Sequence, residues 1–188
     1  MVRLSACAFR KLEQGDLAVI LEWRNAPKVR AAMFTTHVIS PEEHQRWFER
    51  ISKDPTAEHL LFLANGAPAG VFNVTHIDRE AGTCCWAFYA SERAPRGVGA
   101  AMEITALDHM SVAWKMRKIS CEVLSTNEPV LKLHRRFGFQ EEGVFRQQCF
   151  REGRWVDVHR LALFTEAWPA HRERIMRLMR EGVPGAVE

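Results

Sequence analysis

Two glycines, Gly97 and Gly99, stand one residue apart directly before a stretch of helical character, and this segment constrains the fold most. An apolar strand-like run, TCCWAFYA, precedes the glycines, and a second, KISCEVL, follows the helical stretch. The start of a helix exposes backbone N–H groups and partial positive charge, which favour an anion such as phosphate. Glycine lets that anion approach the backbone because it has no Cβ. The pattern predicts a strand–turn–helix–strand unit whose amides, from about Gly97 to Ala101, bind a pyrophosphate with help from Arg96.

The segment does not match two familiar phosphate motifs. A G-x-x-x-x-G-K-[ST] loop is absent, and the third glycine of a dinucleotide fingerprint would fall at Met102. A tight turn without a ligand is the alternative interpretation of the two glycines.

Short-range signals divide the rest of the chain into alternating elements. Asp16 and Ser40 are placed to cap helices, and Glu43 completes a capping box with Ser40. Residues 65–66, Asn-Gly, join two apolar runs as a hairpin. The helix after the glycines is expected to run to Trp114. The order β-α-α-β-β-β-α-β-α-β-β-α predicts an α+β fold, an α/β sandwich in which helices flank a mixed central sheet.

Composition limits the functional classes. The 188 residues predict a single domain over 1–182 with a flexible tail at 183–188, and the net charge of +3 suits polyanionic ligands but not nucleic acid. Five cysteines without a C-x-x-C pair argue against a disulfide framework and against a zinc site, so no metal is expected. The chain shows no signal peptide and no membrane-spanning stretch, which favours a cytoplasmic protein without membrane partners.

The segment NEPVLKLHRRFGF adds a second block, and together with the glycines it resembles the GNAT superfamily of acetyl-CoA-dependent N-acetyltransferases. That superfamily carries [Q/R]-x-x-G-x-[G/A] at its central helix and Asn-x-x-Ala-x-x-x-Tyr-x-x-x-Gly-Phe later. Ala94 stands where Gln or Arg is usual, and His134 stands at the tyrosine position. The positions that match or replace the second motif are Asn127, Val130, His134, Gly138 and Phe139.

The resemblance implies acetyl-CoA as co-substrate, lying between two strands that part from each other. A backbone amide near Phe88 or Tyr89 is the expected donor to the oxyanion. His134 is expected to act as general acid toward the departing thiolate, and His76, Glu122 or water is expected to take the amine proton. The residues expected to hold acetyl-CoA are Phe88, Tyr89, Arg96, Gly97, Val98, Gly99, Ala100, Ala101 and Asn127.

The segment EWRNAPKVRAAMFTTHVISPEEHQRWF resembles the PseH-like N-acetyltransferases, which acetylate the 4-amino group of a UDP-linked amino-dideoxy sugar. This implies a nucleotide-sugar acceptor, a place in pseudaminic acid biosynthesis and flagellum glycosylation, and a possible homodimer. Arginine forks suit phosphate, and aromatic rings suit a base. The expected acceptor-binding residues are Trp23, Arg24, Asn25, Arg30, Met33 and His44.

Two other functions remain open. The C-terminal block FQEEGVFRQQCFREGRWVDVHRLALF is similar to that of the RimJ/RimL group, which acetylates protein N-termini. The departures at Ala94 and His134 also fit a sensor that binds acetyl-CoA without turnover.

Overall fold

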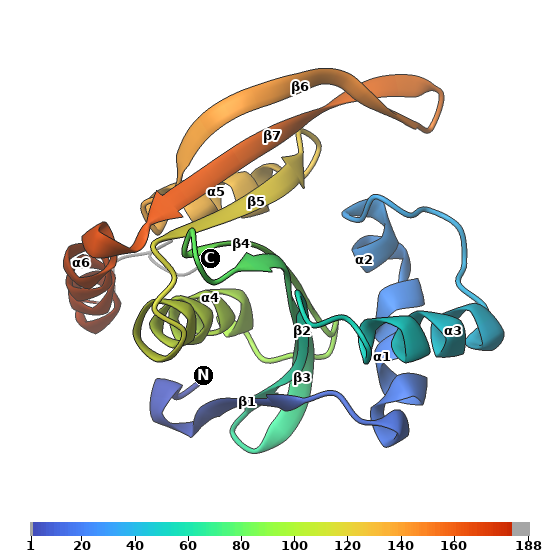
Figure 1. Cartoon of the computed structure of the whole chain (residues 1–188), viewed down its shortest axis with the longest axis horizontal. Coiled ribbons are helices and arrows are strands. Elements are labelled where there is room, and N and C mark those ends of the chain that lie inside the picture. Colours follow the sequence, from blue (N-terminus) through green and yellow to red (C-terminus); the bar gives the residue numbers. More distant parts are fainter. Residues whose placement is uncertain (1, 182–188) are drawn as a thin grey trace.

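Within residues 2–181, which the computed structural model describes, the strands form one seven-stranded mixed sheet in the order β1-β2-β3-β4-β5-β7-β6 (Figure 1). The predicted tail at 183–188 lies outside the described residues, and the single domain over 1–182 stays a prediction. The strands are β1 (Cys7–Lys11), β2 (Glu58–Ala64), β3 (Ala67–Asp78), β4 (Thr83–Ala90), β5 (Lys118–Leu124), β6 (Gln140–Arg151) and β7 (Arg154–Phe164).

Two groups of helices cover the two faces of this sheet. Leu60 and Phe72 pack in a core with residues of α4, α5 and α6, whereas their neighbours Leu61 and Val71 pack with α1, α2 and α3. This division follows from the alternation of side chains along a strand. The α-helices are α1 (Leu17–Asn25), α2 (Pro27–Ala31), α3 (Pro41–Ile51), α4 (Val98–Asp108), α5 (Glu128–Arg136) and α6 (Trp168–Arg180). The shorter helical turns are η1 (Leu4–Ala6), η2 (Gln14–Asp16), the π-helical η3 (His109–Ala113) and η4 (Thr165–Ala167).

Strands β4 and β5 pair in parallel over only three residues each, Thr83–Cys85 with Lys118–Ser120. Beyond that point β4 continues beside β3 alone, and β5 continues beside β7 alone. The expected parted strand pair and the mixed sheet are therefore confirmed. None of the helices in the described residues is long and apolar enough to cross a lipid bilayer.

Several local signals are confirmed. Asn65 and Gly66 join β2 to β3 with φ angles of +53° and +81°, the left-handed values that a tight hairpin turn requires. The Ser40 hydroxyl accepts the Glu43 amide at 3.2 Å at the start of α3. The capping box is incomplete, however, because the Glu43 carboxylate bonds to His37 at 3.0 Å instead.

Other local features differ from the sequence-based prediction, and a competing hydrogen bond accounts for two of the differences. The Asp16 carboxylate does not cap α1, because it accepts two hydrogen bonds from the Arg10 guanidinium and one from the Glu13 amide. The helix after the glycines is not α-helical as far as Trp114. It changes to the π-helical turn η3 after Asp108, where the Ser111 hydroxyl bonds back to the Leu107 carbonyl at 2.6 Å. The short helix α2 was not expected.

Gly138 ends α5 with a φ of +98°, and a Cβ there would lie 2.5 Å from the His171 ring. We expect Gly138→Ala to lower the free energy of unfolding by about 1–3 kcal/mol, since it adds backbone strain and a steric clash. Urea unfolding measures this. Gly143→Ala is the matched control, because a Cβ at Gly143 meets no atom within 4 Å. Equal stability of the two variants would contradict the prediction.

Candidate active site

The turn before α4 combines a left-handed residue with an open approach to the backbone. Gly97 has a φ of +85°, and a Cβ there would meet no atom within 4 Å. A Cβ on Gly99, in the first turn of α4, would find only Leu133 Cδ2 at 3.9 Å. The packing of the protein therefore does not require glycine at this position. A ligand that came close to the backbone would require it, because a Cβ would stand in its way. Arg96 is exposed in the same turn.

Two of the five predicted phosphate-binding amides are already used within the protein. The Val98 amide donates to the Pro95 carbonyl, and the Ala101 amide donates to the Gly97 carbonyl. Three of the five amides that were predicted to bind phosphate therefore remain candidates. The amides without a backbone acceptor in the described residues are those of Gly97, Gly99 and Ala100.

Phe88 and Tyr89 lie on the parted half of β4, beyond its last pairing with β5. The Phe88 ring is partly buried against the core beneath α4, and the Tyr89 side chain is buried on the opposite face, against α1. The backbone at this point pairs with β3 on one side. The structure thus places the predicted oxyanion donors along the gap between the strands.

His134 is buried beneath this gap and paired with an acid. Its Nδ1 lies 2.8 Å from Oε1 of Glu103, which projects from the middle of α4 with no exposed surface. The imidazole lies among the rings of Trp86, Phe88 and Phe139, with centroids 5.1–6.0 Å away. The second oxygen of Glu103, Oε2, has no hydrogen-bond partner among residues 2–181.

Neighbouring groups outweigh the effect of burial on the pKa of His134. Burial alone lowers the pKa of His134, but Glu103, together with Cys121, outweighs it and raises the pKa of His134 to about 10. The imidazole is therefore protonated near neutral pH. A protonated imidazole at this place has a proton available for a thiolate, and that chemistry requires the ring to reach the gap between the strands.

His76 lies away from the parted strands. It occupies an irregular position of β3 with a φ of +52°, is exposed, and contacts Thr75 at 3.2 Å. Its neighbour Thr75 stands opposite Cys85, at the end where β4 and β5 are still paired. The fold does not bring His76 together with the other candidate residues.

Glu122 lies closer to the acceptor side, by which we mean the surface where the segment from α1 to α3 meets the β6–β7 hairpin. It is on β5, bonds to Arg160 at 3.0 Å, and lines a cavity of about 300 Å³. Phe34 lines the same cavity from the loop between α2 and α3, and Gln148 lines it from β6.

Asn127 stands at the start of α5, where its side chain makes no capping hydrogen bond. Asn127 lines a second cavity of about 300 Å³ together with Lys28 and Thr36 from the N-terminal segment. Arg151 and Arg154 line it from the tip of the β6–β7 hairpin, which Figure 1 shows facing α2.

Two of the predicted acceptor residues hold the loop after α2 in place. The Asn25 side chain donates to the Ile39 carbonyl at 2.8 Å and accepts the Ile39 amide at 2.9 Å. Arg30 donates to the backbone carbonyls of Asn25 and Thr36 at 3.1 and 3.0 Å. These contacts fix the backbone of the loop between α2 and α3.

Three other predicted acceptor residues are partly or fully buried in the core. Trp23 is buried, and Met33 packs against the same cluster. The His44 ring stacks on Trp47 with centroids 4.9 Å apart. Burial and the nearby charge of Arg24 both lower the pKa of His44, so the imidazole is neutral near pH 7.

Arg24 retains unused bonding capacity. Its Nη2 donates to the Thr35 carbonyl at 3.2 Å, whereas its buried Nη1 has no partner among the described residues. Arg151, which the sequence analysis missed, has the same property at both Nη atoms. Glu103 was also missed, although an acid inside the apolar run VGAAMEITALD requires a buried partner.

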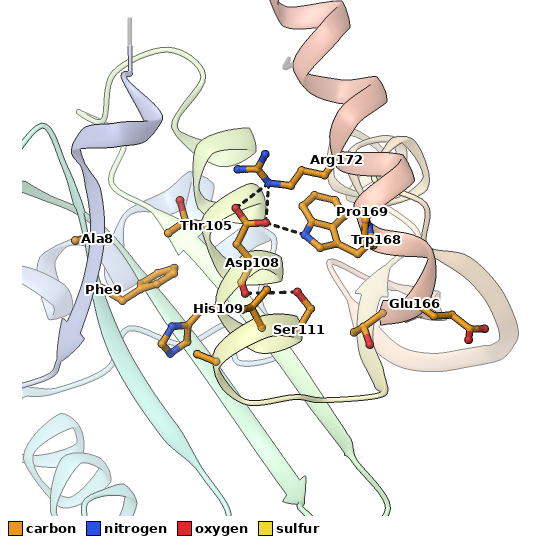
Figure 2. A pocket seen from close by; sticks show the side chains of 13 residues that line it. Ala8, Phe9, Thr105, Asp108, His109, Ser111, Glu166, Trp168, Pro169 and Arg172 are labelled. Carbon is orange, nitrogen blue, oxygen red and sulfur yellow. Dashed lines mark hydrogen bonds and ion pairs between the residues drawn. The ribbon is translucent and has the colours of Figure 1, made fainter.

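A cavity of about 940 Å³ lies elsewhere, between β1, the end of α4 and α6. Figure 2 shows Asp108 at its edge, bonded to Trp168 Nε1 at 2.8 Å and to Arg172 Nε at 2.8 and 2.9 Å. These bonds fix α6 against α4. None of the predicted site residues lines this cavity. Among the described residues no three His, Cys, Asp or Glu side chains are grouped to hold a metal ion.

A family model described as an acetyltransferase (GNAT) domain matches residues 7–140. The chain belongs to the GNAT family. It is an N-acetyltransferase, and acetyl-CoA is its acetyl donor. The resemblance inferred from the glycine turn and the NEPVLKLHRRFGF segment is thereby confirmed.

The names of two similar proteins state different acceptors, an L-amino acid and spermidine. The chain is 24% identical over 162 residues to the L-amino acid N-acetyltransferase AaaT of Escherichia coli, covering 85% of this chain and 98% of the relative. It is 24% identical over 147 residues to the acetyltransferase PseH of Campylobacter jejuni strain 81-176, covering 77% and 91%. A spermidine N-acetyltransferase from Vibrio cholerae, solved with CoA and spermine, superposes with a TM-score of 0.81 at 21% identity, covering 88% of this chain and 99% of that chain. That last match shows the fold.

The Glu103–His134 pair makes stability depend on pH. The pKa of His134 is raised in the folded state, so the stabilisation is complete below about pH 6.5 and is lost as the pH rises through about 10. We expect the free energy of unfolding to fall over this range by at most about 1.4 kcal/mol per pH unit. Urea unfolding from pH 6 to pH 10 measures it.

His134→Asn should flatten this pH dependence. The exposed His76→Asn is the matched control, because asparagine tolerates the positive φ at that position, and it should keep the slope of the natural chain. Parallel profiles for the natural chain and His134→Asn would refute the proposed charge pair.

Proposed function

We propose that this enzyme acetylates the 4-amino group of a UDP-linked amino-dideoxy sugar, in the pseudaminic acid pathway that serves flagellum glycosylation. The observation that carries the proposal is the basic character of the acceptor side. There the buried Nη1 of Arg24 has no partner within residues 2–181, and Lys28 lines the adjoining cavity. A nucleotide sugar brings a diphosphate, which guanidinium and ammonium groups bind well. Similarity to PseH over 77% of the chain supports this acceptor.

An L-amino acid is the second candidate acceptor. Similarity to AaaT covers 85% of the chain, and the carboxylate of an amino acid would suit the same guanidinium groups. In both candidates an anion accompanies the amine. The protein N-termini acetylated by the RimJ/RimL group offer no such fixed anion beside the amine.

The chain's own residues fit acetyl-CoA at the turn before α4. The amides of Gly97, Gly99 and Ala100, which have no backbone acceptor among the described residues, would bind its pyrophosphate together with the dipole of α4. Asn127, whose side chain does not cap α5, would hold the pantetheine arm. When bound, acetyl-CoA supplies the activated acetyl group as a thioester. The parted half of β4, with the amides near Phe88 and Tyr89, would orient that group.

His134 is proposed to deliver a proton to the coenzyme's departing thiolate. Its raised pKa, caused by Glu103 against the effect of burial, keeps it protonated at neutral pH and places its acidity near that of a thiol. Glu122 or water would accept the proton from the amine, because Glu122 lines the acceptor-side cavity. The exposed position of His76 does not favour it as the base.

Replacing Gly99 separates cofactor binding from folding. Gly99→Val should weaken acetyl-CoA binding at least about tenfold, because a branched side chain would occupy the place of a phosphate. The melting temperature should change by less than about 2 °C, because a Cβ at Gly99 meets only Leu133 at 3.9 Å. Isothermal titration with acetyl-CoA measures the affinity.

Gly143→Val is the matched control for this experiment. A Cβ at Gly143 meets no neighbour within 4 Å, and Gly143 lies on β6, away from the turn before α4. It should bind acetyl-CoA like the natural chain. Unchanged affinity in Gly99→Val would remove the phosphate role of the turn.

The acceptor is identified by thiol release from acetyl-CoA in steady state. The UDP-4-amino-4,6-dideoxy sugar, L-amino acids and peptides with ribosomal N-termini are compared at equal concentrations. We expect the highest kcat/KM for the sugar. Turnover with L-amino acids alone would make the second candidate correct. Thermal stabilisation by acetyl-CoA without transfer to any acceptor would indicate a sensor and refute both.

A further inference from the structure

Two arginines far apart in the sequence present unused guanidinium nitrogens to the acceptor side. Nη1 of Arg24 on α1 and both Nη atoms of Arg151 at the end of β6 are buried from water without a hydrogen-bond partner in residues 2–181. Buried polar atoms nearly always have partners, and a buried charge without one is costly. Three such atoms on one side of the protein point to a partner that the free chain does not supply.

The two arginines lie within electrostatic reach of each other. Burial lowers the pKa of Arg24, and the positive charges of Arg30 and Arg151 lower it further, against the opposing effects of Tyr89 and Glu43. Of these two opposing groups, only Glu43 is acidic near neutral pH. Its carboxylate is held 3.0 Å from His37, so it does not pair with Arg24.

The cavity beside them is also basic. Arg151 lines it together with Lys28 and Arg154, while Glu152 is the one acid among its lining residues. Asn127, the proposed contact of acetyl-CoA, lies in the wall of the same cavity. An anion held there would therefore lie beside the proposed path of the thioester.

We propose that Arg24 and Arg151 form one oxyanion subsite that spans α1 and β6 and holds the anionic group of the amine acceptor. The subsite rests on the proposed function for its connection to catalysis, and it adds Arg151 as a specificity-determining residue. Two guanidinium groups offer several N–H donors to a phosphate or carboxylate. They also repel a polycation, so a polyamine is disfavoured as acceptor.

Anion binding tests the subsite without acetyl transfer. The full chain is first saturated with CoA, so that the turn before α4 is filled, and inorganic pyrophosphate is then titrated by calorimetry. We expect Arg24→Gln and Arg151→Gln each to weaken pyrophosphate binding about tenfold or more. The double variant should lose less than the product of the two losses, because both side chains hold one anion.

Arg146→Gln is the matched control, since Arg146 is an exposed arginine on the same strand. It should bind pyrophosphate like the natural chain. Natural affinity in Arg151→Gln, or equal losses in Arg146→Gln, would overturn the subsite.

Competition then identifies the source of the anion. Displacement of pyrophosphate by UDP supports a diphosphate. Displacement by L-amino acids and not by UDP supports the subsite with a carboxylate, and refutes the nucleotide sugar alone. Displacement by neither overturns the subsite, whatever acceptor the transfer assay identifies.

A stability measurement separates binding from a structural role. An arginine that only held the hairpin in place would destabilise the fold when replaced. Because both Nη atoms of Arg151 have no partner in residues 2–181, Arg151→Met should instead raise the melting temperature of the free chain by about 2–4 °C while it weakens anion binding. A lower melting temperature in Arg151→Met would contradict the proposal.

Discussion

The parting of β4 and β5 is the constraint on which the rest of the site depends. The two strands share only the pairs from Thr83–Lys118 to Cys85–Ser120, and the Ser120 hydroxyl closes this short ladder by donating to the Cys84 carbonyl at 3.0 Å. Past that point β4 remains paired with β3, and β5 remains paired with β7. The sheet therefore opens between β4 and β5 while both strands stay hydrogen-bonded on their other sides. The opening exposes strand backbone beside the first turn of α4, which is what a thioester attached to a pyrophosphate requires.

Glu103 and His134 pair with each other in the core beneath this opening. Helix α4 is apolar on nearly every side and lies buried beneath the parted strands, so Glu103, the acid in the middle of the helix, has no access to water. Pairing with His134 neutralises the acid and fixes the ring among Trp86, Phe88 and Phe139. The same contact keeps the imidazole protonated, so the core and the proposed acid chemistry depend on one hydrogen bond.

Features set by neighbouring residues were predictable from the sequence, and features set by distant contacts were not. The hairpin at residues 65–66 and the cap at Ser40 follow from local backbone preference, and both are present. Two local features were nevertheless missed. The π-helical turn after Asp108 and the role of Asp16 involve side-chain hydrogen bonds, from Ser111 to the Leu107 carbonyl and from Arg10 to Asp16, that compete with the expected patterns. For the candidate site, motif spacing predicted the glycine turn and Asn127. It did not predict Arg151, because only the folded hairpin brings this residue to Arg24.

In the proposed function, charge rather than fold discriminates among the candidate acceptors. The backbone superposes well on a spermidine N-acetyltransferase, so the shared fold alone would admit a polycation. The acceptor side argues against one, since Arg24 and Arg151 bring buried positive charge with no acid paired to it in residues 2–181. Burying the ammonium groups of a polyamine there would add repulsion between positive charges to the desolvation cost that the two arginines already carry. An acceptor that carries its own anion removes both costs, which is why the amine and an oxyanion are expected on the same molecule.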